Sequence, residues 1–552
     1  MPPADLTRRD AAHLGLGLAV GAGLCAAHAL DPSVARADAP AIHEPADLRA
    51  SFGDPTQLAR ELEAAGCIVQ RGSFQELDTL KLASEGKLIS CFGNNAGSTY
   101  LVNFLPPAPN QKPAAAVPEH GWPAEEPSPF FDPDAAETFP ANPYFSPAGW
   151  SYKLRPDEAV VMAGPMPPEC VYFSLINYVL LSAVAPDKDY ANSKGFFQVS
   201  GPEDVGDYHP VFGSLGMPCN QFRMATEATP GGGYDPASDG KAAFGARFVY
   251  VMTGDTATLA TVTDALEAAG FGEGIVNTAL LPATELAMGL ERGKDTFCTL
   301  GRVSQPADRD AMDAWIAGLP DAMTVLRVTP QVPNAQPAPA QPVVTRGTDV
   351  HEAGLLPQAR ATMDALRQAI IAQYADEYDY EEPAVEIAVP EGMTAYLNDR
   401  NAQGDNHDTT YLMTGDFTLD SDDDFVVVYG VNHSTTGKAV YSNAILYARP
   451  MLNGVCSVYD GLFEGSADAY LPGLDESGHY YAYKMARQGW GGADEFTATI
   501  PWSTGNEQGA YYGVDNGSPV LAAFRAYVEK ATGVGASYYE IVWDRAIVFH
   551  KR

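Results

Sequence analysis

Basic residues are scarce in this chain of 552 residues: 34 lysines and arginines stand against 70 aspartates and glutamates, which gives a formal net charge of −36. Such an acidic surface repels phosphate backbones and anionic lipid headgroups. The composition therefore argues against nucleic acid as a partner, while cationic small molecules and metal ions remain compatible with it. Apolar residues make up 46% of the chain, enough for about two or three folded domains.

Closely spaced cysteines are missing as well. No CxxC, no haem-attachment motif and no iron–sulfur spacing occurs, which excludes zinc-ribbon and cluster proteins. Buried thiols and one or two disulfides both remain open for the six cysteines of the mature chain, Cys67, Cys91, Cys170, Cys219, Cys298 and Cys456. The absence of a GxGxxG motif argues against a standard dinucleotide fold. No segment after the first forty residues approaches the apolar run of about eighteen residues that a membrane span needs, so we expect no stable membrane span in the mature protein.

The first 37 residues have the pattern of an export signal. Thr7, Arg8 and Arg9 precede a run rich in glycine, alanine and leucine, and Ala35 and Ala37 form a small-x-small cleavage pattern. This segment resembles a bacterial twin-arginine signal, although alanine stands where phenylalanine is usual; an ordinary secretory signal is the alternative. The resemblance implies a bacterial protein exported to the periplasm or the exterior, and a route that carries folded proteins, often with a cofactor.

We predict an α+β, β-rich fold with three regions after the signal. Residues 48–221 have the pattern of a β-rich N-terminal domain, interrupted by a proline-rich loop at 106–147. Residues 245–329 follow the order β-α-β-β-α-β, which is typical of a ferredoxin-like (split βαβ) module. A Pro/Ala/Gln linker at 330–346 leads to a helix and a β-rich C-terminal domain at 347–552.

Two segments resemble uncharacterised bacterial secreted proteins with jelly-roll-like β-sandwich domains. These are 152–181, where a strand and a proline-rich turn lead into an aromatic strand, and 426–443, with the sequence VVVYGVNHSTTGKAVYSN. The resemblance implies β-sandwich domains on either side of the ferredoxin-like module. It implies no activity and no catalytic residue.

One late segment carries the end signals of a helix. Ser518 and Pro519 are typical of a helix start, and Gly533 is typical of a helix end. The alanine-rich sequence between them predicts a helix over 518–533.

Two histidine-containing turns flank neighbouring predicted strands, 409–419 and 425–433. His407 lies in the turn GDNHD before the first strand, and His433 follows the second. If these strands pair as a hairpin, both histidines meet at one end of the sheet. The cluster then offers His433, Asp408 and His407 for acid–base catalysis, and His407, His433, Asp405 and Asp408 as ligands for a divalent metal such as zinc, iron or calcium. Asx-rich turns without chemistry are the alternative interpretation.

Other polar residues suit hydrogen bonding to a substrate, namely Asn432, Lys438, Tyr441, Asn95 and Tyr100. The run DSDDD at 420–424 suggests calcium, but the rest of an EF-hand loop is missing and a solvated turn explains it better. Two functional hypotheses follow. The first is an exported soluble enzyme on a small polar molecule or glycan, a metal-assisted hydrolase or oxidoreductase using the His/Asp cluster. The second is an exported β-sandwich protein that binds a ligand or carbohydrate without catalysis. The substrate, the reaction class and the oligomeric state stay open.

Overall fold

The computed structural model describes residues 48–84, 91, 93–106, 108–109, 150–183, 208–291, 293–340, 345–487, 495–504 and 512–552. The predicted export signal and most of the predicted proline-rich loop lie outside these ranges. The described strands form three sheets, so the chain is α+β and β-rich as the sequence predicted. Among the described helices, none combines the length and the apolar character needed to cross a membrane.

The first sheet contains nine strands in the order β5-β4-β8-β2-β1-β9-β3-β6-β7. All neighbouring strands are antiparallel except the parallel pair β6 and β7. The strands are β1 (Cys67–Glu76), β2 (Ser98–Phe104), β3 (Ala159–Pro165), β4 (Cys170–Ala183), β5 (Tyr208–Asn220), β6 (Arg247–Thr253), β7 (Val276–Leu280), β8 (Thr296–Pro306) and β9 (Thr324–Pro330).

The elements predicted for the ferredoxin-like module are present, but the module itself is not. β6, α3 (Thr256–Ala268), β7, β8, α4 (Arg309–Ala322) and β9 follow the expected order, and the Asp255 side chain caps the start of α3. However, β1 and β2 lie between β8 and β9, and β6 pairs directly with β7. The prediction of a separate ferredoxin-like module was therefore wrong, because its strands share one sheet with those of the predicted N-terminal domain.

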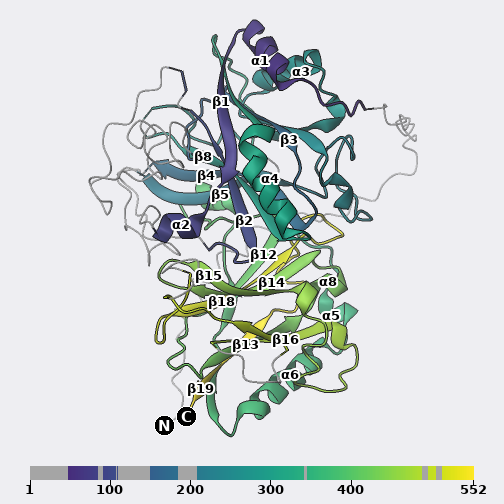
Figure 1. Ribbon diagram of the computed structural model, residues 1–552, viewed down its shortest axis with the longest axis vertical. Coiled ribbons are helices and arrows are strands. Elements are labelled where there is room, and N and C mark those ends of the chain that lie inside the picture. Colours follow the sequence, from purple (N-terminus) through teal and green to yellow (C-terminus); the bar gives the residue numbers. More distant parts are fainter. Residues whose placement is uncertain are drawn as a thin grey trace, which may run out of the picture. The chain divides into compact units, whose positions relative to one another are not determined.

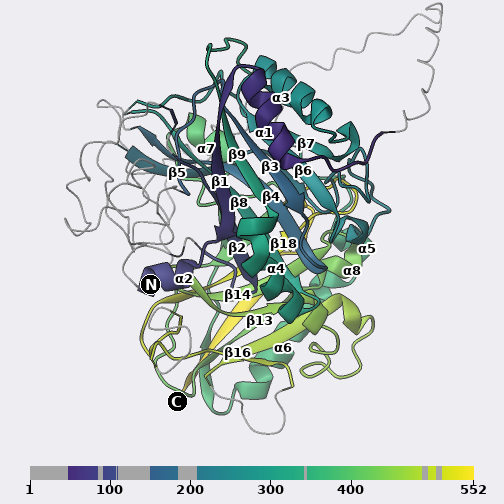
Figure 2. The same ribbon diagram turned by 45° about the horizontal axis from the view of Figure 1, so that its top comes forward.

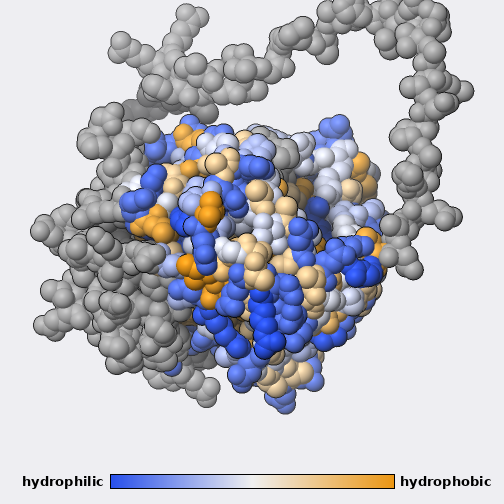
Figure 3. Space-filling view, turned by 90° about the horizontal axis from the view of Figure 1, so that it is seen from above, coloured by the Kyte–Doolittle hydropathy of each residue, from blue (hydrophilic) through white to orange (hydrophobic). Residues whose placement is uncertain are grey.

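Helices cover both faces of this sheet (Figure 2). On one face, α1 (Pro55–Ala64) and α3 place Leu62 and Leu266 against Val161 in a common core. On the other face, α4 packs Met312 against Met162. Residues 161 and 162 are neighbours on β3, and successive side chains of a strand point to opposite faces. The short α2 (Thr79–Ser84) lies beyond β1. Seen from above the molecule as drawn in Figure 1, hydrophilic residues separate smaller hydrophobic groups on the surface (Figure 3).

The remaining strands form two five-stranded sheets, in the orders β10-β19-β13-β16-β17 and β11-β12-β18-β14-β15. Val428 of the first sheet and Phe524 of the second belong to one core, so the sheets pack face to face as a sandwich. The strands are β10 (Tyr378–Glu381), β11 (Val385–Ile387), β12 (Thr409–Thr414), β13 (Phe425–Val431), β14 (Tyr441–Ala448), β15 (Asn453–Tyr459), β16 (Tyr480–Ala486), β17 (Thr497–Thr499), β18 (Val520–Tyr527) and β19 (Arg545–Lys551).

The predicted helix over 518–533 was wrong, because this segment contains the central strand β18. β18 pairs with β12 on one side and β14 on the other. Phe524 points into the sandwich core, whereas Leu521 belongs to a separate core on the opposite side. A strand with both faces buried and both edges paired has no polar side to alternate with, so its alanine-rich sequence resembles a helix.

The three sheets are stacked one below the other in Figure 1: the nine-stranded sheet is uppermost, the sheet that contains β18 is next, and the sheet that contains β13 is lowest. α6 (Ala359–Tyr374) covers the outer face of the β13 sheet, where Leu366 packs with Val427. The β18 sheet lies on the other side of the sandwich core, and its outer face meets the nine-stranded sheet. There the Asn94 side chain accepts a hydrogen bond from the backbone N–H of Gly454 at 3.0 Å. The side chains between these two sheets form the site described next.

Candidate functional site

The predicted site residues Asp405 and Asp408 connect the sandwich to the nine-stranded sheet. The Asp405 carboxylate accepts hydrogen bonds from the backbone N–H and the hydroxyl of Ser214, at 2.8 and 2.7 Å. Oδ2 of Asp408 accepts from the hydroxyl of Tyr172 at 2.8 Å and from the side-chain amide of Asn220 at 2.7 Å. Both aspartates are buried, so hydrogen bonds inaccessible to solvent attach the GDNHD turn to β4 and β5.

His407 also contributes to this buried contact between the turn and the nine-stranded sheet. Its Nδ1 lies 2.9 Å from the carbonyl oxygen of Gly216, and its Nε2 lies 2.9 Å from the carboxylate of Glu391. Burial opposes the charge on His407, but the hydrogen bond to Glu391 and the charge of Asp405 outweigh it and raise the pKa of the imidazole. Despite its own burial, Glu391 has its pKa lowered to about 2 by this bond. Both ring nitrogens of His407 are therefore occupied within the protein.

His433 is enclosed by two other carboxylates. Nδ1 lies 2.8 Å from Glu352, in α5 (Glu352–Leu355), and Nε2 lies 3.2 Å from Asp544. All three side chains are buried. Burial disfavours the imidazolium, yet Glu352 and Asp544 raise the pKa of His433 well above its ordinary value. The charged ring thus holds α5 and the segment before β19 against α8 (His433–Thr436).

The structure does not bring His407 and His433 together. β12 and β13 belong to different sheets, so the predicted hairpin was wrong and with it the shared His/Asp metal cluster. Within the described residues, the histidines and carboxylates close enough to share a metal ion are Asp420, Asp424 and His550. Asp424 there accepts from the backbone N–H of Asp420 at 2.8 Å, which is the local turn that the sequence favoured.

Three of the predicted substrate-binding residues have partners inside the sandwich. Nζ of Lys438 lies 2.5 Å from Glu529 and 2.6 Å from Glu540, and all three side chains are buried. Asn432 accepts a hydrogen bond from the hydroxyl of Ser434 at 2.7 Å. Tyr441, fully buried, accepts from the side-chain amide of Asn443 at 2.8 Å. These contacts are structural, and none of the three residues lines the cavity described below.

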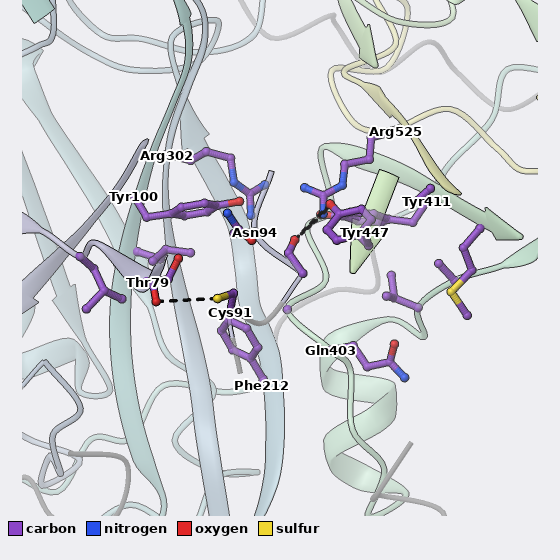
Figure 4. A pocket seen from close by; sticks show the side chains of 18 of the residues that line it. Thr79, Cys91, Asn94, Tyr100, Phe212, Arg302, Gln403, Tyr411, Tyr447 and Arg525 are labelled. Atoms are coloured by element: carbon purple, nitrogen blue, oxygen red, sulfur yellow. Dashed lines mark hydrogen bonds between the residues drawn. The ribbon is translucent and has the colours of Figure 1, made fainter. Parts of the chain in front are cut away.

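Of the other two predicted substrate-binding residues, Tyr100 lines a cavity between the sheets, whereas Asn95 is not among the lining residues. The hydroxyl of Tyr100 accepts a hydrogen bond from the backbone N–H of Asn95 at 2.8 Å. The cavity measures ≈ 70 Å³. Figure 4 shows Arg302 and Tyr100 from the nine-stranded sheet on one side, and Arg525, Tyr411 and Tyr447 from the sandwich on the other.

Arg302, on β8, is a buried cation that has no counter-ion in the described part of the chain. The residue is 4% exposed, and its Nε and Nη1 have no hydrogen-bond partner there. The guanidinium carbon lies 5.3 Å from the ring centroid of Tyr100, a cation–π contact. Among the described residues, no carboxylate forms a salt bridge with it. Buried charges in proteins are nearly always paired, so this arrangement is exceptional.

Arg525, on β18, repeats the pattern from the opposite wall. Its Nη2 donates to the carbonyl oxygen of Gly93 and to the hydroxyl of Tyr447, both at 2.6 Å, while its Nε has no partner. It too forms no salt bridge with a carboxylate of the described chain. The guanidiniums of Arg302 and Arg525 share electrostatic contacts with Tyr100, Tyr411 and Tyr527, so they lie in one common environment.

The two arginines have their clearest electrostatic effect on the pKa of Tyr527. The ring is fully buried, and its hydroxyl accepts from Nη1 of Arg525 at 3.4 Å. Burial alone would raise the pKa of Tyr527, but Arg525 and Arg302 outweigh that effect and lower it below its ordinary value. In contrast, burial raises the pKa of Tyr411 to about 12, although the nearby Thr409 side chain lowers it slightly. By hydrogen-bond geometry, the Tyr411 hydroxyl has no partner among the described residues.

The cavity therefore combines unpaired positive charge with free N–H and O–H donors in a protein of strongly negative net charge. An anion placed there offers a counter-charge to the two guanidiniums, and a carboxylate matches the planar fork of arginine. Sequence reasoning missed both arginines, because no motif surrounds them. The available signal was a single charged residue in each of two strands, Arg302 and Arg525.

The cysteines do not supply a nucleophile here. All six cysteines of the described chain are free thiols, which decides between the two alternatives left open by the sequence. Cys91 and Cys298 line the cavity. Burial raises the pKa of Cys91 to about 12 and raises that of Cys298 further, so both remain protonated.

Comparisons with known proteins add no activity. No family model matches this chain, and no curated protein matches it. An uncharacterised protein from Burkholderia cenocepacia has a similar solved structure, with 11% identity, 89% of this chain and 86% of that chain covered, and a TM-score of 0.32. The VPA0106 protein from Vibrio parahaemolyticus is similar over 72% of this chain and 87% of its own, with 11% identity and a TM-score of 0.30.

Proposed function

We propose that this chain is an exported binding protein for a small organic anion, held between Arg302 and Arg525. The observation that carries the proposal is the pair of buried guanidiniums, one from each wall of a cavity, whose free N–H groups have neither a hydrogen-bond partner nor a carboxylate partner among the described residues. Export is proposed from Arg8 and Arg9 and the run that follows them.

A jelly-roll connection of the sandwich supports a binding scaffold. Without the edge strands β11 and β17, the sheet orders are β10-β19-β13-β16 and β12-β18-β14-β15. In this arrangement the first of eight strands pairs with the last, and the second pairs with the seventh, as two interlocked Greek keys require. Jelly rolls include many ligand-binding domains, but the fold alone does not select a function.

An enzyme is the second candidate, and Tyr527 is the observation in its favour. A tyrosine whose pKa is lowered by two arginines has the property of a general base. However, Tyr527 is fully buried and is not among the residues that line the cavity, so its hydroxyl has no access to a bound molecule. A metal-assisted enzyme required His407 and His433 in one cluster. Because the two histidines are apart, that hypothesis has no ligand set to support it.

The proposal is tested by binding measurements on the purified full chain. We expect acetate and propionate to bind in isothermal titration calorimetry, whereas acetamide, a neutral molecule similar in shape to acetate, does not bind. Arg302→Met and Arg525→Met should each weaken binding by about 2–5 kcal/mol, because each removes one partner of a buried charge pair.

Arg309→Met is the matched control, since Arg309 lies in an exposed pair with Asp313 on α4. It should bind anions as the wild type does. Equal binding by Arg302→Met, or the same affinity for acetamide as for acetate, would contradict the proposal.

A further inference from the structure

The cavity has a polar end and an apolar end. Arg302 and Arg525 face each other in the upper part of the cavity as drawn, with Tyr411 beside Arg525 (Figure 4). Nε and Nη1 of Arg302, Nε of Arg525 and the hydroxyl of Tyr411 are buried there without a hydrogen-bond partner in the described chain. The other side contains Cys91 and Phe212, and Leu180 and Leu300 also line the cavity. Thr79 lies beside Cys91 at this end, and Gln403 lines the cavity from the facing side (Figure 4). Oε1 of Gln403, a hydrogen-bond acceptor, has no partner in the described chain.

From this asymmetry we infer that the bound anion is a short-chain monocarboxylate, with its carboxylate at the two arginines and its hydrocarbon part against Leu180, Leu300 and Phe212. The inference rests on the proposed function and names the class of ligand for that site. It depends on three properties of the cavity: which groups donate, how large the space is, and what covers the rest.

The donors fit a planar carboxylate better than a tetrahedral anion. A carboxylate offers two oxygens on one side of the molecule, and two guanidiniums from opposite walls satisfy both. Phosphate and sulfate carry oxygens in all directions. In this cavity some of those oxygens would face Leu300 and Phe212 without a hydrogen bond, which is a costly arrangement.

The size of the cavity limits the length of the chain. A volume of ≈ 70 Å³ holds roughly five water molecules, since one buried water needs about 10–15 Å³ measured in this way. Propionate and butyrate have about the same number of non-hydrogen atoms. Longer acids, such as octanoate, exceed the available space.

The hydrocarbon part is recognised by burial. Each methylene group moved from water to the apolar end should improve affinity by about fourfold, until the space is filled. The acceptor Oε1 of Gln403 adds a preference for a hydroxyl at the far end of the chain, because that hydroxyl would satisfy a buried oxygen.

The test is a titration series with the full chain, using formate, acetate, propionate, butyrate, hexanoate and octanoate, together with inorganic phosphate and sulfate. We expect affinity to rise about fourfold for each methylene group up to propionate or butyrate and to fall for hexanoate and octanoate. A flat dependence on chain length, or phosphate binding as tightly as propionate, would overturn the carboxylate inference and leave anion binding intact. Failure of every anion in the series to bind would instead overturn the proposed function.

Two buried leucines of β4 give a matched pair of variants. Leu180 lines the cavity, whereas Leu175 points to the opposite face of the sheet. Leu180→Ala enlarges the apolar end, so the best ligand should become longer by one or two carbons. Leu175→Ala should lower stability to a similar extent but keep the same best ligand. If the best chain length stays the same in Leu180→Ala, or changes in Leu175→Ala, the hydrocarbon chain lies elsewhere and the inference is overturned. The wild-type series tests the inference even if a variant does not fold.

Discussion

Arg302 and Arg525 line the same cavity from two different sheets, and neither guanidinium has a carboxylate partner in the described chain. Two like charges buried close to the same three tyrosines destabilise the empty protein, because each loses its hydration without gaining a counter-ion. A site that costs stability when empty is typical of function rather than of folding.

Arg302→Met should therefore raise the free energy of unfolding of the ligand-free protein by about 1–3 kcal/mol, since methionine fills the space without an unsatisfied polar group. Urea unfolding followed by circular dichroism measures this change. The same variant loses anion binding, so stability and function should move in opposite directions.

The control for this substitution is Arg327→Met. Arg327 is as deeply buried, but it lies 2.7 Å from Glu158 in a closed salt bridge. Its removal leaves the buried carboxylate of Glu158 without the positive charge of its salt bridge, and should lower stability by about 3–5 kcal/mol. A loss of the same size in Arg302→Met would show that Arg302 is structural.

Tyr527 should ionise before the other buried tyrosines. Arg525 and Arg302 lower its pKa, so its phenolate forms earlier as the pH rises from neutral. Tyr527→Phe should remove the first step of the tyrosinate absorbance titration. Tyr178→Phe is the control, because burial raises the pKa of Tyr178 well above its ordinary value and it cannot contribute to that step. An unchanged first step in Tyr527→Phe would refute the assignment.

His433 should make stability depend on alkaline pH. Its pKa is raised in the folded protein, so its contribution is complete below the ordinary imidazole value of about 6.5 and is lost as the pH rises through the raised value. At neutral pH, His433→Gln should lower stability by about 3–5 kcal/mol, because Glu352 and Asp544 stay buried without the positive charge.

The difference between His433→Gln and the wild type should shrink as the pH increases. His351→Gln, at an exposed position beside the same α5 helix, should show neither effect. A constant difference across the alkaline range would mean that the imidazole is neutral in the folded protein.

A substitution at Gly430 is an independent test of the cluster formed by His433, Glu352 and Asp544. A methyl group added to this glycine on β13 would lie 2.3 Å from Oδ1 of Asp544. Gly430→Ala should thus displace Asp544 from His433 and lower the midpoint of thermal unfolding, with a cost of about 1–3 kcal/mol. Gly415→Ala, where the added methyl group has no neighbour within 4 Å, should leave the midpoint unchanged.

Local patterns predicted the elements of this protein well where neighbours in sequence determine them. The cap of α3 at Asp255 and the strands β6 to β9 follow from side-chain chemistry and periodicity within short windows. The pairing of those strands does not, because β1 and β2 reach the centre of the sheet from a distant part of the chain. Periodicity also failed for β18, since a strand buried on both faces has no alternation to detect.

The candidate site shows the same limit. Tyr100 and Asn95 were predicted from a polar turn; Tyr100 lines the cavity, whereas Asn95 only donates its backbone N–H to the Tyr100 hydroxyl. Arg302 and Arg525 gain their meaning only from facing each other across two sheets, which no local window contains. His407 and His433 have the residue types of a metal site, yet each is held by carboxylates that lie far away in sequence.

The pairing of β1 with β9, and of β10 with β19, also determines when the chain can fold. In both pairs the first strand leaves the ribosome long before its partner exists. Proteins with such distant contacts fold slowly, because a large loop must close before the contact stabilises anything. Neither the large sheet nor the sandwich can be completed until nearly all of its sequence has been synthesised. Folding is thus expected to be largely post-translational, and a transport route that carries folded proteins, as proposed from Arg8 and Arg9, leaves time for it.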